Sequence, residues 1–195
     1  MSQGALETRR TDREEITQAI LRYARGVDRR DWPMVRSVYH DDAYDDHGAF
    51  KGDLDGLMAW LQRRHAVIAK SMHFVSNILV EFDSVDGAVA ESYYLARQTM
   101  GPEAGESRLM LLGDKAAAVD RSASISAEMT GRYVDRFERR DGVWRIARRI
   151  VLFEQLIAKV DDSIPLSDAW TPSRRDGSDA LAEMRARVGL PPTTP

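Results

Sequence analysis

Two long alternating segments joined by Asp141-Gly142 constrain the fold of this chain more than any other feature. From Met129 to Arg139 and from Val143 to Leu156, the side chains alternate in character with the period of a strand that has one buried face. Asp-Gly favours a two-residue type I′ turn, because both of its residues adopt positive φ there. The sequence therefore predicts a long antiparallel hairpin at this place.

A second pair of predicted strands precedes this hairpin. Met72 to Phe82 alternates, Asp86-Gly87 is a turn signal, and Ala88 to Met100 returns as the partner strand. Both faces of the Met72 to Phe82 strand are largely apolar, so we expect it to be covered on both sides. Further upstream, the polar and turn-rich residues 40–52 predict a short hairpin.

The N-terminal part of the chain has helical periodicity instead. Residues 12–27 predict a helix with one apolar stripe, made up of Ile16, Ala19, Ile20, Tyr23 and Val27. A second helix is predicted after the cap residue Asp31, and a third from about Leu54 to Lys70. Residues 101–124 follow no clear pattern apart from the short apolar run Leu109 to Leu112. Three helices followed by a long antiparallel sheet predict an α+β fold.

The length of 195 residues fits a single domain with a substantial core. Beyond the last predicted strand the chain becomes polar and contains Pro165 and Pro172, and a short helix is predicted at about Ser178–Val188. We therefore expect an α+β domain in residues 1–160 and a C-terminal extension in residues 161–195.

Composition and motifs argue against several kinds of function. A net charge of −3 gives no reason to expect nucleic acid or an acidic membrane surface as a partner. The chain has no cysteine, which excludes disulfides and thiolate nucleophiles. No glycine-rich loop precedes a helix and the four histidines are scattered, so we expect neither a nucleotide cofactor nor a metal. No apolar segment approaches the ~20 residues that span a bilayer, and a cytoplasmic location is expected.

The remaining ionisable candidates lie at one helix end and on two predicted strands. Asp28 follows the first helix and His73 begins a long strand; a buried carboxylate beside a histidine fixes its tautomer and raises its basicity. Arg149 on the last strand has apolar neighbours on its own face, so one buried arginine is expected there. Spacing alone leaves the ordinary alternatives open: Asp28 as a turn acid, His73 as a core or rim histidine, and Tyr23 as a core residue.

Tyr23 and Asp28 pose a geometric condition on any shared site. They are five residues apart, about 140° around an ideal helix, so they would not share a face if the helix continued. Both can reach one cavity only if the helix unwinds near Gly26 or if the cavity is wide.

A series of motifs gives the chain a resemblance to a known family. In order they are Gly26-Val-Asp-Arg-Arg30, Lys51-Gly52, His73-Phe-Val-Ser-Asn77, Glu81-Phe82, and Glu138-Arg-Arg-Asp-Gly-Val-Trp144 running into Arg148-Arg149. Across about residues 12–155 the sequence resembles the SnoaL-like branch of the nuclear transport factor 2-like superfamily, the group with lindane dehydrochlorinase, bile-acid dehydratase and scytalone dehydratase. The resemblance implies a cone-shaped, curved antiparallel sheet wrapped round three N-terminal helices, a deep apolar pocket and often a homotrimer.

The resemblance also implies roles for individual residues. In the dehydrochlorinase-like pattern the aspartate of the Gly-Val-Asp motif orients the histidine that acts as the base, and an arginine after the tryptophan assists. Here these are Asp28, His73 and Arg149. The bile-acid dehydratase pattern adds a tyrosine five residues before the aspartate, which Tyr23 matches. In an apolar pocket of this kind we expect four aromatic residues to bind the substrate: Phe50, Tyr94, Tyr133 and Phe153.

The function that the resemblance implies is a cofactor-independent lyase acting on a bulky apolar, aromatic or alicyclic substrate. Elimination of water is the first expectation, and carbon–carbon cleavage such as formaldehyde release needs the same base. The alternatives are a polyketide-type cyclase, an isomerase, or a non-catalytic small subunit of a ring-hydroxylating dioxygenase. Residues 100–127 and the tail after residue 160 depart from the family core, and we expect them to shape the pocket mouth or the oligomer interface.

Overall fold

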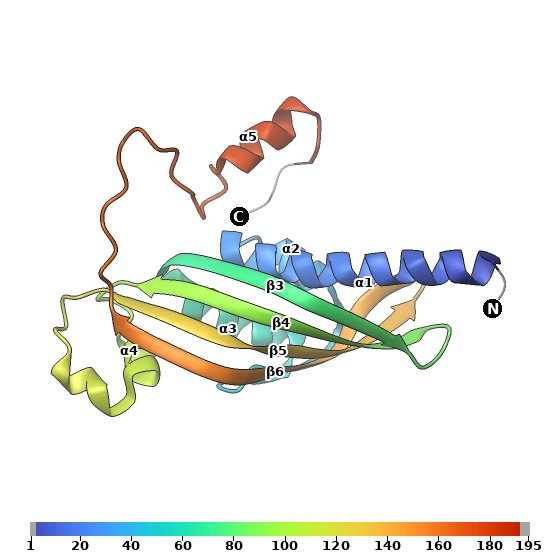
Figure 1. Ribbon diagram of the computed structural model, residues 1–195, viewed down its shortest axis with the longest axis horizontal. Coiled ribbons are helices and arrows are strands. Elements are labelled where there is room, and N and C mark those ends of the chain that lie inside the picture. Colours follow the sequence, from blue (N-terminus) through green and yellow to red (C-terminus); the bar gives the residue numbers. More distant parts are fainter. Residues whose placement is uncertain (1–2, 192–195) are drawn as a thin grey trace.

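The computed structural model describes residues 3–191 of the chain. Its helices are α1 (Gln3–Arg29), α2 (Trp32–Ser37), α3 (Leu54–Ala66), α4 (Gly105–Leu112) and α5 (Ala180–Arg187), with the 3-10 helix η1 (Gly113–Ala118) after α4. Its strands are β1 (Tyr39–Asp46), β2 (Lys51–Asp53), β3 (Ile68–Phe82), β4 (Gly87–Met100), β5 (Ile125–Arg140) and β6 (Val143–Val160). The predicted α+β class is confirmed: helices come first and a curved sheet follows (Figure 1).

The strands form one sheet in the order β2-β1-β6-β5-β4-β3. Both predicted long hairpins are present, β5 with β6 and β3 with β4. Asp141 and Gly142 have φ of 52° and 78°, as a type I′ turn requires. The short β1–β2 hairpin is also present, but β1 joins the sheet through a parallel pairing with β6. The sheet is therefore mixed, whereas the sequence predicted an antiparallel one.

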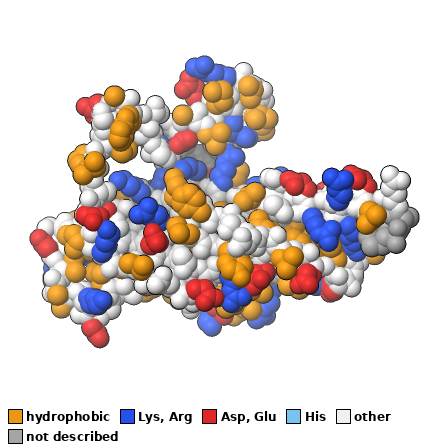
Figure 2. All heavy atoms as spheres, in the orientation of Figure 1, with side chains coloured by type: hydrophobic (Ala, Val, Ile, Leu, Met, Phe, Trp, Pro, Cys, Tyr) orange, Lys and Arg blue, Asp and Glu red, His pale blue; other side chains and the backbone are white. Residues whose placement is uncertain are grey.

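Within this chain β3 is covered on its inner face only, whereas the sequence predicted cover on both faces. Met72 and Phe74 are 45% and 54% exposed on the outer face of the sheet, where Figure 2 shows hydrophobic side chains among charged ones. His73 points to the inner side. The pairing register with β4 shifts around Asn77, which has a positive φ of 48°, and this bulge changes which residues point inward. Val80 is consequently buried further along the strand.

A bulge in β6 decides which of the two neighbouring arginines, Arg148 or Arg149, is buried. Ala147 is an extra residue in the pairing with β5, so the inward positions change parity at that point. Trp144 before the bulge and Arg149 after it are both buried, although they are five residues apart. Arg148 is exposed. The buried arginine that the apolar neighbours predicted is therefore Arg149, and its inward position depends on the bulge.

The helices pack on the inner side of the sheet. In Figure 1, α1 runs beside β3 along the long axis of the molecule and α3 lies behind the sheet. The buried faces of α1, α2 and α3 form one core with the inner residues of the strands. A Cβ atom at Gly26 would lie 2.7 Å from Val35 Cγ2, so glycine lets α2 approach the end of α1 closely. This contact fixes the last turn of α1, which contains Asp28.

The segment between β4 and β5, which the sequence does not place, forms α4 and η1 at one end of the sheet (Figure 1). Arg108 holds this segment together, because its buried guanidinium donates hydrogen bonds to the carbonyls of Asp120 and Ala123. Leu111 of α4 is buried against the sheet side of the molecule. The segment between β4 and β5, which was predicted to depart from the family core, thus forms two short helices packed on the body.

Beyond β6 the chain runs without regular structure to α5, which overlaps the helix predicted at 178–188. Arg175 attaches this tail to the body, because it donates hydrogen bonds to the carbonyls of Val27, Asp28 and Ile68. Of the predicted segments 1–160 and 161–195, the first two residues and the last four lie outside the described part. No helix within residues 3–191 is long and apolar enough to cross a membrane.

Candidate active site

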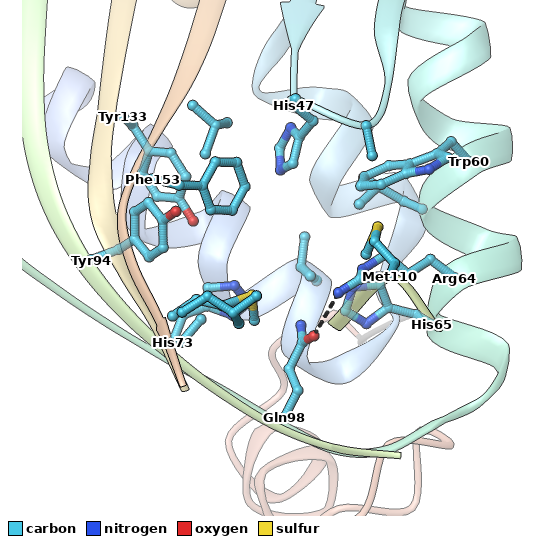
Figure 3. A pocket seen from close by; sticks show the side chains of 18 of the residues that line it. His47, Trp60, Arg64, His65, His73, Tyr94, Gln98, Met110, Tyr133 and Phe153 are labelled. Atoms are coloured by element: carbon cyan, nitrogen blue, oxygen red, sulfur yellow. Dashed lines mark hydrogen bonds between the residues drawn. The ribbon is translucent and has the colours of Figure 1, made fainter. Parts of the chain in front are cut away.

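A cavity of about 340 Å³ lies between the inner face of the sheet and the helices α1 and α3 (Figure 3). This volume is within the range of small-molecule sites. The lining is largely apolar and aromatic, with polar groups from separate elements: Tyr23, His47, Arg64, His65, His73, Tyr94, Gln98 and Tyr133. Among the described lining residues there is no Asp or Glu, and residues 3–191 contain no cluster of His, Asp and Glu suited to a metal ion.

His73 and Asp28 form a hydrogen-bonded pair at one wall of this cavity. His73 Nδ1 lies 2.7 Å from Asp28 Oδ1, and the His73 backbone N–H donates to Asp28 Oδ2 over 2.7 Å. Ser71 Oγ donates to Asp28 Oδ1, also over 2.7 Å. Burial alone would raise the pKa of Asp28, but the hydrogen bonds and charge of His73, together with Ser71, hold this pKa below its ordinary value. Asp28 is therefore an ionised acceptor.

The orientation of the His73 ring follows from that contact. Because a carboxylate only accepts hydrogen bonds, Nδ1 of the neutral ring carries the proton and Nε2 keeps a lone pair. The ring lines the cavity, and Nε2 has no hydrogen-bond partner among the described residues. Asp28 is buried behind the ring and does not itself line the cavity. The pair presents an oriented base to a molecule in the cavity.

Neither of the two predicted ways for Tyr23 and Asp28 to share a cavity occurs: the helix does not unwind near Gly26, and Asp28 does not line the cavity. α1 continues to Arg29, so the two side chains leave it in different directions. Tyr23 lines the cavity directly, whereas Asp28 reaches β3 and contacts the cavity through His73. The last two turns of α1 therefore contribute to the site in two directions, Tyr23 toward the cavity and Asp28 toward β3.

A second histidine, His47, faces the cavity from another side and is also paired with a carboxylate (Figure 3). His47 Nδ1 lies 2.6 Å from Asp45 Oδ1, and Tyr39 OH donates to Asp45 Oδ2 over 2.9 Å. His47 Nε2 is 3.2 Å from Tyr23 OH, which donates to it when His47 is neutral with its proton on Nδ1. Burial is the main cause that raises the pKa of Tyr23, so its phenol keeps its proton.

Arg149 lies behind the Tyr23 wall and is not part of the cavity lining. It is 0% exposed, and its Nε and Nη2 donate to the two carboxylate oxygens of Asp135 over 2.7 and 2.6 Å. Burial alone would lower the pKa of Arg149, but the attraction of Asp135 outweighs it, and the pKa lies well above its ordinary value. The guanidinium carbon lies 4.2 Å from the ring centroid of Tyr23 and 4.3 Å from that of Tyr133. Arg149 is thus placed to hold the two tyrosines.

Three of the four aromatic residues expected to bind substrate line the cavity. Tyr94 and Tyr133 stack with their ring centroids 4.6 Å apart, and Phe153 meets Tyr94 edge-on at 6.4 Å. Phe50 is not in the lining. Its ring stacks on Trp60, which is, so Phe50 supports the wall from behind.

Four polar residues of this site are not predicted from the sequence: His47, Arg64, His65 and Gln98. For His47 a signal exists, because residues two apart on a strand share a face, and Asp45 precedes it by two. Arg64 and His65 lie on a predicted helix, and Gln98 on a predicted strand. Nothing in their spacing indicates that α3 and β4 bring them together.

A protein-family model for a SnoaL-like domain matches residues 8–150 of the chain. The chain belongs to the SnoaL-like domain family. The resemblance drawn from the sequence motifs is thereby confirmed. No curated protein matches the sequence at a significant level.

Solved structures share the fold of this SnoaL-like protein at low sequence identity. A scytalone dehydratase-like protein from Novosphingobium aromaticivorans has a TM-score of 0.62 at 18% identity, over 78% of this chain and 90% of its own. The type 3 hexachlorocyclohexane dehydrochlorinase of Novosphingobium barchaimii has a TM-score of 0.64 at 20% identity, over 82% and 98%. A type 2 hexachlorocyclohexane dehydrochlorinase reaches 0.65 at 19% identity, over 84% and 98%.

Proposed function

We propose that this SnoaL-like protein is a cofactor-independent lyase that eliminates water from a bulky apolar, aromatic or alicyclic substrate. The observation that carries the proposal is the His73–Asp28 pair, whose Nε2 lone pair is unpartnered among the described residues and borders a largely apolar cavity. Tyr23 OH, at the same cavity, supplies an acid. Elimination needs a base and an acid on the two sides of one substrate. Structures named as dehydrochlorinases and as scytalone dehydratase-like share the fold, which supports the choice of reaction.

The two histidines are assigned different tasks because their Nε2 atoms have different surroundings. His47 Nε2 is engaged by Tyr23 OH, whereas His73 Nε2 can accept a proton from a carbon atom in the cavity. His73 is therefore the base and Asp28 its orienting carboxylate. Tyr23 is the acid, and the Asp45–His47 pair behind it positions its hydroxyl group through the contact with His47 Nε2.

In the proposed reaction His73 Nε2 removes a proton from the carbon next to the one that bears the hydroxyl group. The electron pair of the broken C–H bond forms a C=C bond while the C–O bond breaks. The leaving oxygen takes the Tyr23 proton and departs as water. After the product leaves, the Tyr23 oxygen takes a proton from solvent and His73 Nε2 returns its proton to solvent. The negative charge of Asp28 stabilises the imidazolium that forms on His73.

The remaining predicted residues serve to bind and to position. Tyr94, Tyr133 and Phe153 form an aromatic wall against which an apolar ring of the substrate packs. Arg149 acts on the reaction through Tyr23 and Tyr133, which its guanidinium contacts, and does not touch the substrate. Formaldehyde release from a hydroxymethyl group would use the same base: His73 takes the hydroxyl proton, the O–H electron pair forms the C=O bond of formaldehyde, and the C–C bond breaks. The carbon left behind keeps the electron pair of that bond and takes a proton from Tyr23.

Turnover by dyad variants tests the proposal. Hydroxylated aromatic and alicyclic compounds are screened for loss of water by mass spectrometry, and the best substrate is used for kinetics. We expect Asp28→Asn and His73→Ala each to lower kcat by about 10²–10⁴, the usual contribution of a general base and its orienting group. Asp41→Asn, an exposed aspartate, is the matched control and keeps normal turnover. Near-normal kcat in either dyad variant would show that His73 is not the base.

A further inference from the structure

One end of the cavity carries a positive charge whose described hydrogen-bond partner is an amide. Arg64 of α3 lines the cavity, and its Nη2 donates to Gln98 Oε1 over 3.2 Å (Figure 3). Among the side chains that the structure describes, no carboxylate forms an ion pair with the Arg64 guanidinium, and burial lowers the pKa of Arg64. Arg149 is the opposite case, since its buried charge is balanced by Asp135.

The groups next to Arg64 are hydrogen-bond donors toward the cavity. Arg175 Nη2 donates to His65 Nδ1 over 2.8 Å, so the proton of the His65 ring is on Nε2. Gln98 uses its Oε1 to accept from Arg64, which leaves its NH2 group to donate. Burial, reinforced by the charges of Arg175 and Arg64, lowers the pKa of His65 well below its ordinary value, and the ring stays neutral.

We infer that this end of the cavity is an anion subsite, in which Arg64, His65 and Gln98 bind a carboxylate group of the substrate. The planar guanidinium fork matches a carboxylate in a two-point contact. An unpaired cation withdrawn from water is costly, and a bound anion removes that cost. Trp60, four residues before Arg64 on α3, lies under the guanidinium with its ring centroid 5.8 Å away and limits where it can move.

The inference rests on the proposed function in taking this cavity as the substrate site, and it narrows the substrate class. The substrate is an organic acid whose carboxylate lies at the Arg64 end. Its apolar body extends along the wall of Tyr94, Tyr133 and Phe153, with His73 and Tyr23 beside it (Figure 3). A neutral hydrocarbon or alcohol would leave the Arg64 charge unpaired and bind weakly.

Titration calorimetry with 2-naphthoate and its neutral analogue 2-naphthamide tests the subsite. We expect the wild-type protein to prefer naphthoate, and Arg64→Gln to weaken naphthoate binding by about 10- to 100-fold while leaving naphthamide unchanged. Arg64→Lys keeps the positive charge but loses the planar guanidinium. We expect its affinity for naphthoate to lie between those of the wild type and Arg64→Gln. Arg63→Gln is the matched control, because Arg63 is the exposed neighbour on the same helix, and it leaves both affinities unchanged.

Three results would overturn the inference: no binding of naphthoate to the wild-type protein, equal affinity for the two compounds, or an unchanged naphthoate affinity in Arg64→Gln. Thermal unfolding shows whether the variant is folded, and we expect its Tm to match or exceed that of the wild type, since an unpaired charge is removed. His73→Ala separates this claim from the lyase proposal. We expect the His73→Ala protein to bind naphthoate through Arg64 as the wild type does. The subsite can therefore be confirmed even if no elimination reaction is detected.

Discussion

Among single residues, the two histidine–carboxylate pairs of this cavity differ in what the second ring nitrogen meets. Both rings donate from Nδ1 to an aspartate, over 2.7 Å for His73 and 2.6 Å for His47. The Nε2 of His47 contacts Tyr23 OH, and that of His73 has no described partner. Under the proposed function, the His73 pair therefore acts as the base, and the His47 pair holds the hydroxyl group of the acid Tyr23.

The proton path through Tyr23 makes a specific kinetic prediction. Tyr23→Phe keeps the ring that packs on Arg149 and removes the hydroxyl from the cavity. We expect kcat to fall by about 10²-fold, with a smaller effect on KM, because the acid acts in the transition state. His47→Gln should lower kcat as well. Steady-state kinetics should show that the double variant is no slower than Tyr23→Phe, since both residues serve one path. If the loss of kcat in the double variant equalled the product of the two single losses, Tyr23 and His47 would act independently, which would contradict this prediction.

The sequence located part of this site and not the rest. Asp28, His73 and Tyr23 stand in motifs, and the structure brings all three to one cavity or its immediate support. Arg149 also stands in a motif, but its burial behind Tyr23 depends on the bulge at Ala147, which pairing decides and spacing does not show. Arg64, His65 and Gln98 meet only because α3 packs across the strands, a tertiary fact with no local signal.

Among the elements, the strongest local signals were the most reliable. The β5–β6 hairpin was predicted because Asp141-Gly142 specifies its turn and the alternation is long. The prediction that β3 is covered on both faces assumed strict alternation along the whole strand. The bulge at Asn77 reverses the alternation, so that residues of one predicted face point inward before it and residues of the other face point inward after it. The α4 helix was not predicted, since its short apolar run also fits a strand or a loop. The parallel contact of β1 with β6 joins segments about one hundred residues apart and has no sequence signature.

The burial of His65 on α3, together with the nearby charge of Arg175 from the tail, makes the stability of the protein depend on pH. The folded-state pKa of His65 is well below its ordinary value of 6.5, so the unfolded chain takes up this proton first as the pH falls. The unfolded state then binds more protons, and stability decreases as the pH falls below about 6.5. Urea unfolding between pH 7.5 and 5.5 should show a loss of up to about 1.4 kcal/mol per pH unit from this group. This contribution should be absent from His65→Gln. If the free energy of unfolding fell with pH in the same way for the wild type and the variant, the prediction would be contradicted.

At the scale of the whole molecule, the curved sheet encloses the cavity on its inner side, and its outer side is partly apolar. Phe74, Leu79 and Tyr93 are 54%, 57% and 44% exposed on β3 and β4, and hydrophobic side chains are also visible on α5 (Figure 2). Exposed apolar surface of this kind is typical of protein–protein contacts. The homotrimer implied by the family resemblance stays a prediction, for which this face is the natural candidate.

The central claim is that Asp28 holds the neutral His73 ring with its proton on Nδ1 and a bare Nε2 in the cavity. Nitrogen-15 NMR of histidine-labelled protein reads the two ring nitrogens directly, and the His73→Ala spectrum identifies the signals. At a pH where the ring is neutral, we predict a protonated Nδ1 and an unprotonated Nε2 for His73, and loss of this fixed tautomer in Asp28→Asn. A neutral ring protonated on Nε2 in the wild-type protein would contradict the account, because His73 would then have no lone pair to offer the substrate.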